Sequence, residues 1–202
     1  KAYRTGLFPM ADNRDSEELF WVNPKKRGVF PLNRFHISRS LARQLRKSSF
    51  QFKVNHDFDA VVAGCASRED TWINASIQQS YRALFEMGHA HTLEVYEGSE
   101  LVGGVYGVSI GAAYFGESMF SHRPNTSKMA LAYLVDRLRL AGFKLFDTQF
   151  LTPHLATLGA VEITQDAYLT ALVDAVKLAA DFNRPDIPNS AQEMIQRNTQ
   201  TS

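Results

Sequence analysis

The tetrapeptide Phe-Asp-Thr-Gln at residues 146–149 contains a pattern that suits catalysis. Asp147 and Gln149 are two residues apart, and in a β-strand such residues face the same side. The expected strand ends at this point, and ligands of open α/β sheets bind at strand ends. The two residues are therefore a candidate catalytic couple. A buried Asp that fixes a loop would account for the same pattern equally well.

Glu117 is a second candidate, because it lies between glycine and apolar residues at the end of another expected strand. A carboxylate in such a place can be partly buried and face a substrate amine. It can also cap the helix that follows, and from the pattern alone capping is the more common outcome. The pattern is compatible with both roles.

Trp72 precedes an expected helix whose first turn suits a phosphate group. An exposed tryptophan there would stack on a nucleic-acid base, an interaction worth about 1–3 kcal/mol. A single tryptophan is more often an ordinary core residue, so the pattern does not decide between the two roles.

The charge is balanced overall, with 22 basic and 21 acidic residues, but it is unevenly distributed. Residues 19–56 contain nine basic side chains and no acidic one. A block of one sign in a nearly neutral protein indicates a polyanionic partner, such as a phosphate backbone. The candidates for phosphate contacts are Arg34, Arg39, Arg43, Arg46 and Lys47.

Several other chemistries lack their usual residues. Cys65 is the single cysteine, which excludes an internal disulfide and a cysteine zinc site. His89 and His91 form a pair that suits a metal, but no carboxylate or cysteine completes a recognisable set, so we expect no metal. Neither a G-x-S-x-G nucleophile motif nor a G-x-G-x-x-G dinucleotide motif occurs.

The longest uncharged stretch, residues 101–116, is shorter than the roughly 20 residues of a membrane helix. It also contains five glycines. We therefore expect no membrane partner. A single cysteine is compatible with a reducing compartment, so we expect a cytoplasmic protein, and we expect it to be a monomer.

Hydrophobic periodicity predicts the elements that must position these residues. Helices are expected at 38–47, 58–65, 74–87, 127–141 and 166–180, with one helical turn at 154–159. Strands are expected at 50–55, 91–97, 101–110, 112–120, 144–150 and 161–164. The order favours an α+β fold, with a mixed sheet and helices on both faces, as in N-acetyltransferase domains.

The chain is expected to divide into three parts. Residues 1–33 are rich in turns and are expected to form a small N-terminal domain. Residues 34–180 are expected to form an acetyltransferase-like (GNAT-like) catalytic domain. Residues 181–202 are polar, contain two prolines, and are expected to form an extended or frayed tail.

Ten segments, taken in order, resemble motifs of the leucyl/phenylalanyl-tRNA–protein transferase family. The resemblance covers about residues 2–175. Five of the segments are Ala-Tyr-Arg-Thr-Gly-Leu-Phe-Pro-Met (2–10), His-Ile-Ser-Arg-Ser (36–40), Thr-Trp-Ile (71–73), Gly-Glu-Ser-Met-Phe-Ser (116–121) and Asp-Thr-Gln (147–149).

The resemblance implies an enzyme that moves Leu or Phe from charged tRNA to the α-amine of proteins beginning with Arg or Lys, which marks them for degradation. Asp147 would orient and polarise the amide of Gln149 near that amine. Trp72 would help hold the terminal adenosine, and the basic run would grip the acceptor stem. Glu117 is the candidate for the cationic side chain of the acceptor. Thr148, where the family often has Cys, would point away from Asp147 and Gln149.

An apolar pocket would take the Leu or Phe side chain. Such a pocket discriminates weakly between apolar groups, so Met is a possible slower substrate. The matching positions are Val105, Tyr114, Met119, Leu131, Leu134 and Phe146, with Met10 at the wall of the substrate site.

Two other functions fit the same elements. A coenzyme-A-dependent N-acetyltransferase would need a glycine-rich pyrophosphate loop, whereas residues 122–128 contain no glycine. An RNA-binding module without catalysis would explain the basic run and Trp72 but would leave Asp147, Gln149 and Glu117 without a role. Because an aminoacyl ester is already activated, the transferase function implies no cofactor.

Overall fold

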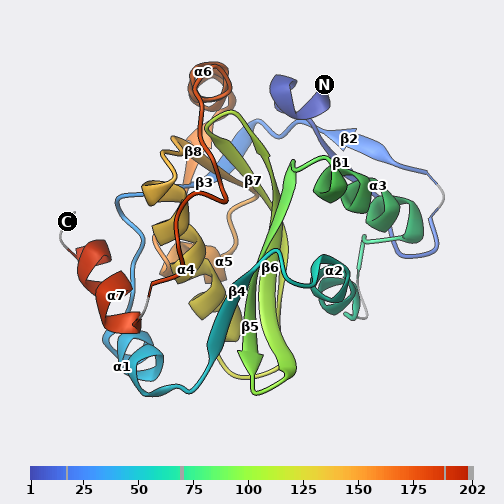
Figure 1. Ribbon diagram of the computed structural model, residues 1–202. Coiled ribbons are helices and arrows are strands. Elements are labelled where there is room, and N and C mark those ends of the chain that lie inside the picture. Colours follow the sequence, from blue (N-terminus) through green and yellow to red (C-terminus); the bar gives the residue numbers. More distant parts are fainter. Residues whose placement is uncertain (17, 69–70, 189, 200–202) are drawn as a thin grey trace.

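The computed structural model describes residues 1–16, 18–68, 71–188 and 190–199. Its centre is a seven-stranded sheet with the strand order β4-β5-β6-β7-β8-β3-β9 (Figure 1). Neighbouring strands run antiparallel except for β7 and β8, which are parallel. A separate two-stranded sheet, β1-β2, belongs to a small N-terminal part.

The elements largely match those expected from the periodicity. The strands are β1 (Phe8–Met10), β2 (Phe20–Val22), β3 (Lys26–Phe30), β4 (Gln51–Val54), β5 (Ala90–Glu97), β6 (Glu100–Ile110), β7 (Ala113–Ser121), β8 (Leu145–Gln149) and β9 (Val161–Thr164). The helices are η1 (Ala2–Thr5), α1 (Arg39–Lys47), α2 (Phe58–Ala66), α3 (Ala75–Glu86), α4 (Thr126–Leu140), α5 (Pro153–Thr157), α6 (Gln165–Ala175) and α7 (Ala191–Thr199).

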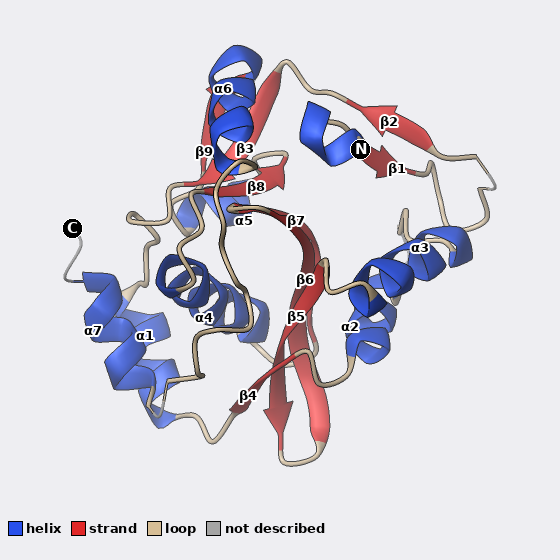
Figure 2. Ribbon diagram, turned by 45° about the horizontal axis from the view of Figure 1, so that its top comes forward, coloured by secondary structure: helices blue, strands red, loops and turns tan. Residues whose placement is uncertain are grey.

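Helices cover both faces of the large sheet, which confirms the expected fold class. Helices α1, α4 and α7 lie on one side, and α2 and α3 lie on the other (Figure 2). Each side has its own apolar core: Leu41, Leu131 and Met194 belong to the first, and Val61 and Ile77 to the second. The sheet is therefore buried between two layers, as its long apolar strands require.

Side-chain caps fix the starts of two helices. The Ser38 hydroxyl accepts the Leu41 N–H at 3.2 Å and begins α1. The Asn74 side chain accepts the Ile77 N–H at 2.8 Å and begins α3 just after Trp72. These caps satisfy backbone donors that a helix start leaves free.

Strand β3 enters the large sheet between β8 and β9. Residues 26–30, which fall within the expected N-terminal domain of residues 1–33, therefore complete the sheet of the larger part. The division of the chain after residue 33 remains a prediction.

The expected extended tail is wrong for residues 191–199, which form α7. Met194 and Ile195 are buried against the core beside α1 and α4, and the Arg197 guanidinium binds the Asp136 carboxylate at 2.6 Å. Residues 189 and 200–202 of the expected tail lie outside the described residues. The apolar spacing 191, 194, 195 is typical of a helix face and explains the packing.

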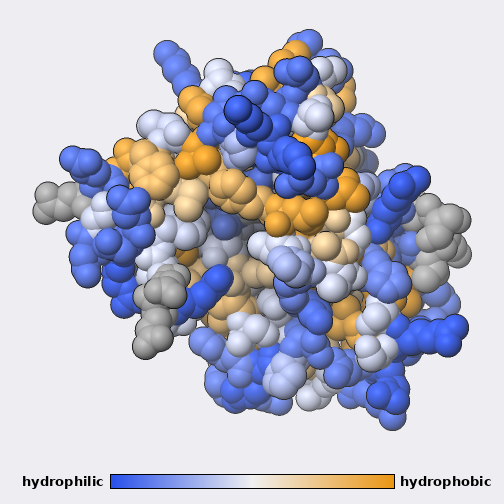
Figure 3. Space-filling model, turned by 180° about the vertical axis from the view of Figure 1, so that it is seen from behind, coloured by the Kyte–Doolittle hydropathy of each residue, from blue (hydrophilic) through white to orange (hydrophobic). Residues whose placement is uncertain are grey.

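The surface has an apolar and a hydrophilic region on the face opposite Figure 1. Apolar side chains gather across the upper half of this face, whereas its lower edge is hydrophilic (Figure 3). Large exposed apolar residues include Phe20 and Trp21 on β2 and Phe150 after β8. In the described part of the chain, no helix is both long and apolar enough to cross a membrane.

Candidate active site

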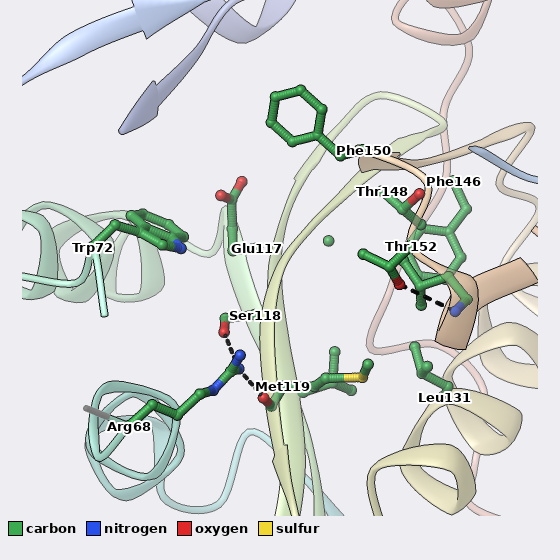
Figure 4. A pocket seen from close by; sticks show the side chains of 13 residues that line it. Arg68, Trp72, Glu117, Ser118, Met119, Leu131, Phe146, Thr148, Phe150 and Thr152 are labelled. Atoms are coloured by element: carbon green, nitrogen blue, oxygen red, sulfur yellow. Dashed lines mark hydrogen bonds between the residues drawn. The ribbon is translucent and has the colours of Figure 1, made fainter. Parts of the chain in front are cut away.

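The candidate site lies where two parallel strands separate. The pairing of β7 with β8 is limited to Ala113–Leu145, Tyr114–Phe146 and Phe115–Asp147. Beyond these pairs, a cavity of about 240 Å³ lies between residues 116–119 of β7 and the end of β8 (Figure 4). The cavity therefore reaches both faces of the sheet through the gap between these strands.

A bulge in β7 sets the direction of Glu117. Tyr106 pairs with Ser118 and Gly107 pairs with Gly116, so Glu117 is the extra residue between them. Bulges bend a strand and redirect a side chain, and they occur often beside active sites. Glycine is needed at Gly107, because a Cβ there would collide with the Phe115 carbonyl oxygen.

Glu117 is buried and accepts three hydrogen bonds. The Tyr3 hydroxyl donates to Oε1 at 2.7 Å, the Tyr81 hydroxyl donates to Oε2 at 2.7 Å, and Gln149 Nε2 donates to Oε2 at 2.9 Å. Burial raises the pKa of Glu117 to about 7, although the three hydrogen bonds oppose that rise. This carboxylate is not a helix cap, so the capping interpretation is wrong.

Asp147 is fully buried in a second carboxylate cluster. Arg27 binds it with two parallel hydrogen bonds, from Nε to Oδ1 at 2.9 Å and from Nη2 to Oδ2 at 2.7 Å. The Tyr168 hydroxyl also donates to Oδ2, at 2.7 Å. The Arg27 guanidinium lies between the rings of Phe8 and Tyr168, with its Cζ 4.6 and 4.4 Å from the ring centroids. These contacts fix the end of β8.

Gln149 connects the two clusters in a way that differs from the expectation. Its backbone N–H donates to Asp147 Oδ1 at 2.8 Å, whereas its side-chain amide binds Glu117. The prediction that Asp147 orients the amide itself is wrong, because Gln149 has a φ of 65° and leaves the regular strand alternation. Asp147 holds the backbone, and Glu117 orients the amide.

Most of the expected substrate residues meet at the cavity. Its apolar lining includes Val105, Met119, Leu131 and Phe146, and Trp72 and Glu117 lie on the other side of β7 (Figure 4). Three expected residues do not line it. Tyr114 and Leu134 are fully buried in the first core, and Met10 packs against the second core from β1.

The sequence did not single out several residues of the site. Thr148 was expected only to point away from Asp147 and Gln149, yet it lines the cavity, as its alternation with Asp147 along β8 allows. The phenols and the cation that hold the carboxylates come from distant segments, so no local pattern connects them. The further lining residues are Arg68, Ser118, Phe150, Thr152 and Leu155, and the supporting residues are Tyr3, Arg27, Tyr81 and Tyr168.

The basic run does not form one surface. Arg27 is buried with Asp147, and Lys26 pairs with Glu162 at 3.2 Å. The five expected phosphate-binding residues, by contrast, are exposed on or near α1, and none of them forms an ion pair within the described part of the chain. They are Arg34, Arg39, Arg43, Arg46 and Lys47.

Of the histidine pair, His91 is held by side-chain contacts. The His91 ring stacks on Phe182 with centroids 4.2 Å apart, and one of its nitrogens lies 3.0 Å from the Ser109 hydroxyl. Across residues 1–16, 18–68, 71–188 and 190–199, no three His, Cys, Asp or Glu side chains gather as a metal-binding group.

Comparison with known proteins shows which family the chain resembles. The family model described as leucyl/phenylalanyl-tRNA protein transferase matches residues 29–173, and the model of its N-terminal domain matches residues 1–25. The chain belongs to this family. As a leucyl/phenylalanyl-tRNA–protein transferase, it is an enzyme that uses aminoacyl-tRNA and a protein as substrates.

Relatives with the same name match nearly the whole chain. The leucyl/phenylalanyl-tRNA–protein transferase of Ruegeria pomeroyi is 58% identical over 200 residues, which are 99% of this chain and 95% of that protein. The Cereibacter sphaeroides transferase is 55% identical over 202 residues, which are 100% and 94% of the two chains. A solved C-terminal domain of a putative lysylphosphatidylglycerol synthetase from Agrobacterium fabrum is 14% identical, with a TM-score of 0.42, and the match covers 93% of this chain and 71% of that one.

Glu117 is expected to make folding stability depend on pH. Burial raises its pKa to about 7 in the folded transferase, against an ordinary value of 4.5. Between these values only the folded protein holds the proton, so the free energy of unfolding falls as pH rises, by about 1.4 kcal/mol per pH unit. Urea unfolding of wild type and Glu117→Gln at several values between pH 4.5 and 8 measures the effect. As pH rises, the free energy of unfolding of the wild type should fall relative to that of the variant. If the two proteins showed the same dependence on pH, Glu117 would not have a pKa raised by burial.

Proposed function

We propose that this transferase moves Leu or Phe from aminoacyl-tRNA to the α-amine of proteins that begin with Arg or Lys, and that the product is marked for degradation. The observation that carries the proposal is the gap between β7 and β8. It brings an apolar cavity next to a buried carboxylate and an amide that can receive an amine. The reaction would take place in the cytoplasm.

The apolar part of the cavity suits the side chain of the donor amino acid. Val105, Met119, Leu131 and Phe146 provide a lining without charge, which favours Leu and Phe over polar residues. One methylene in such a pocket changes binding by only about 1–3 kcal/mol, so Met is proposed as a slower substrate.

The terminal adenosine is proposed to lie against Trp72. This side chain is half-buried beside the cavity mouth, close to the start of α3. A base stacked on its indole would place the ribose and its ester over the gap between the strands. The exposed cations of α1 would hold phosphates of the acceptor stem without reading its sequence.

The amine of the acceptor is proposed to bind between Gln149 and Glu117. Ionised Glu117 accepts hydrogen bonds only, so the Gln149 side chain must turn its NH₂ group toward it, and Oε1 is then directed away. No described residue donates to that oxygen, so it is free to accept an N–H of the amine. A carboxylate offers about four acceptor positions, and Glu117 uses three, which leaves one for the cationic Arg or Lys side chain of the acceptor.

The reaction needs a neutral amine and a positioned ester. The amine has a free pKa of about 7.7–8.0, so near neutral pH it must lose a proton before attack. Its nitrogen forms a bond to the ester carbonyl carbon, the bond from that carbon to the ribose oxygen breaks, and the ribose oxygen receives a proton. An amide oxygen is too weak a base to remove the first proton, so Gln149 would aim the amine rather than deprotonate it.

A peptide series tests the proposal. Labelled leucyl-tRNA is mixed with the enzyme and peptides that differ only in residue one, namely Arg, Lys, Ala and Asp. Transfer should occur with Arg and Lys and should be at least tenfold slower with Ala. An Arg peptide with an acetylated N-terminus is the matched control and should receive nothing. Equal transfer to the Ala peptide would refute the acceptor choice, and no transfer to any peptide would refute the function.

A further inference from the structure

Arg68 is a cation at the cavity with no role in the proposed transfer described above. It follows α2 and lines the cavity on the same side of β7 as Trp72 (Figure 4). Its Nη2 donates to the Ser118 hydroxyl at 3.1 Å and to the Met119 carbonyl oxygen. The guanidinium is thus held against β7 beside the gap between the strands.

The turn that carries Arg68 is itself anchored. The Arg14 guanidinium donates to the Ala66 carbonyl oxygen at 2.6 Å and to the Arg68 carbonyl oxygen at 3.0 Å. The position of Arg68 is therefore fixed from the backbone as well as from its side chain. Such preorganisation reduces the loss of conformational entropy that accompanies the binding of an anion.

The Arg68 guanidinium keeps donors for a ligand. It has five N–H groups, and Nη2 alone accounts for both of its hydrogen bonds. Within the part of the chain that the structure describes, Arg68 forms no ion pair, and its Nε and Nη1 have no partner. Its Nε and Nη1 can each give a charge-assisted hydrogen bond to a phosphate oxygen, whereas both side-by-side pairs of N–H groups include Nη2, which already binds β7.

The position of Arg68 along β7 indicates which phosphate. Its guanidinium donates a hydrogen bond to the carbonyl oxygen of Met119. Met119 lies two residues after Glu117, a separation of about 7 Å along a strand. Glu117 marks the proposed amine subsite, and Trp72 marks the proposed adenine subsite. A ribose whose 3′ ester reached the amine subsite would therefore turn its 5′ phosphate toward Arg68.

We propose that Arg68 binds the last internucleotide phosphate of the tRNA, the one that precedes the terminal adenosine. This inference rests on the proposed function, because it takes aminoacyl-tRNA as the donor. Arg68 thereby fixes the register of the terminal nucleotide, so that the ester lies opposite Gln149. Its role differs from that of the α1 cations, which bind the stem.

The test combines a protein variant with an RNA variant. Leucyl-tRNA is prepared with either a normal phosphodiester or a neutral methylphosphonate at the last linkage. Transfer to an Arg peptide is measured as kcat/KM for wild type and Arg68→Gln. The methylphosphonate should slow the wild type about tenfold to a hundredfold, the range expected for a charge-assisted hydrogen bond. Arg68→Gln should show the same loss with normal RNA and no further loss with the methylphosphonate.

Two further variants keep the result interpretable. Arg184→Gln, which removes an exposed arginine elsewhere, should behave like wild type with both RNAs. Arg68→Lys keeps the charge and should remain sensitive to the methylphosphonate, which reports on the inference even if Arg68→Gln fails to fold. The inference would be overturned if the methylphosphonate lowered kcat/KM of Arg68→Gln by the same factor as that of wild type. It would also be overturned if Arg68→Gln were as active as wild type with normal RNA. A wild type that transfers nothing from normal RNA would instead refute the proposed function.

Discussion

Replacing Gln149 with alanine is expected to lower the rate of transfer by about a hundredfold to a thousandfold. Its amide is fixed by Glu117, and Oε1 is the group that would aim the attacking amine. Removing a positioned hydrogen-bonding group at a reacting centre typically has an effect of this size. The measurement is the single-turnover rate at saturating leucyl-tRNA and Arg peptide, with tRNA binding measured separately and expected to stay unchanged.

Two controls separate the amide from the backbone at this position. Gln149 has a φ of 65°, which alanine adopts at a cost but glycine adopts freely. Gln149→Gly should therefore lose as much rate as Gln149→Ala, while folding with less strain. Gln79→Ala removes an exposed glutamine from α3 and should leave the rate unchanged. A Gln149→Gly enzyme within twofold of wild type would show that the amide has no part in transfer.

Replacing Arg27 with methionine is expected to destabilise the fold by about 3–5 kcal/mol. The change leaves the Asp147 carboxylate buried without its cation, and both side chains are at most 1% exposed. It also removes the cation held between Phe8 and Tyr168. In a chain of this length the loss corresponds to a fall in Tm of roughly 6–20 °C. Thermal and urea unfolding measure it.

The neighbouring residue provides the matched control. Lys26 also pairs with a carboxylate, Glu162, but its side chain is 73% exposed. Because exposed ion pairs contribute about 0–1 kcal/mol, Lys26→Met should hardly change the midpoint. The double variant Arg27→Met/Asp147→Leu should recover part of the loss, since no charge then stays buried alone. If Lys26→Met lowered the free energy of unfolding as much as Arg27→Met, burial of the Arg27–Asp147 pair would not explain its contribution to stability.

The periodicity of the sequence predicted most elements because they are local. Ser38 and Asn74 cap helices through contacts three residues away, and the alternating strands β5 to β7 follow one another through short turns. The place of β3 in the sheet could not be read in this way, because its partners β8 and β9 lie more than 100 residues away. Helix α7 was missed because its polar composition concealed a short apolar face.

In the site, too, local sequence indicates which residues matter, whereas distant contacts set their orientation. Glu117 and Asp147 stand out by type and position, yet their orientation depends on a bulge and on a positive φ at Gln149, which no simple alternation predicts. The partners of the carboxylates lie far away in the sequence. The Arg27 and Asp147 side chains are separated by 120 positions, and Tyr3 reaches Glu117 across 114. Tyr114 and Leu134 have suitable side chains for a pocket but belong to the buried core.

The gap between β7 and β8 is proposed to receive the aminoacyl group beside Gln149. A crystal structure with an adenosine that carries phenylalanine at its 3′ position through a stable amide would show where that group binds. We expect the phenyl ring among Val105, Leu131 and Phe146, with the carbonyl group turned toward Gln149. A ring bound outside this gap, with Gln149 remote from the carbonyl carbon, would refute this placement.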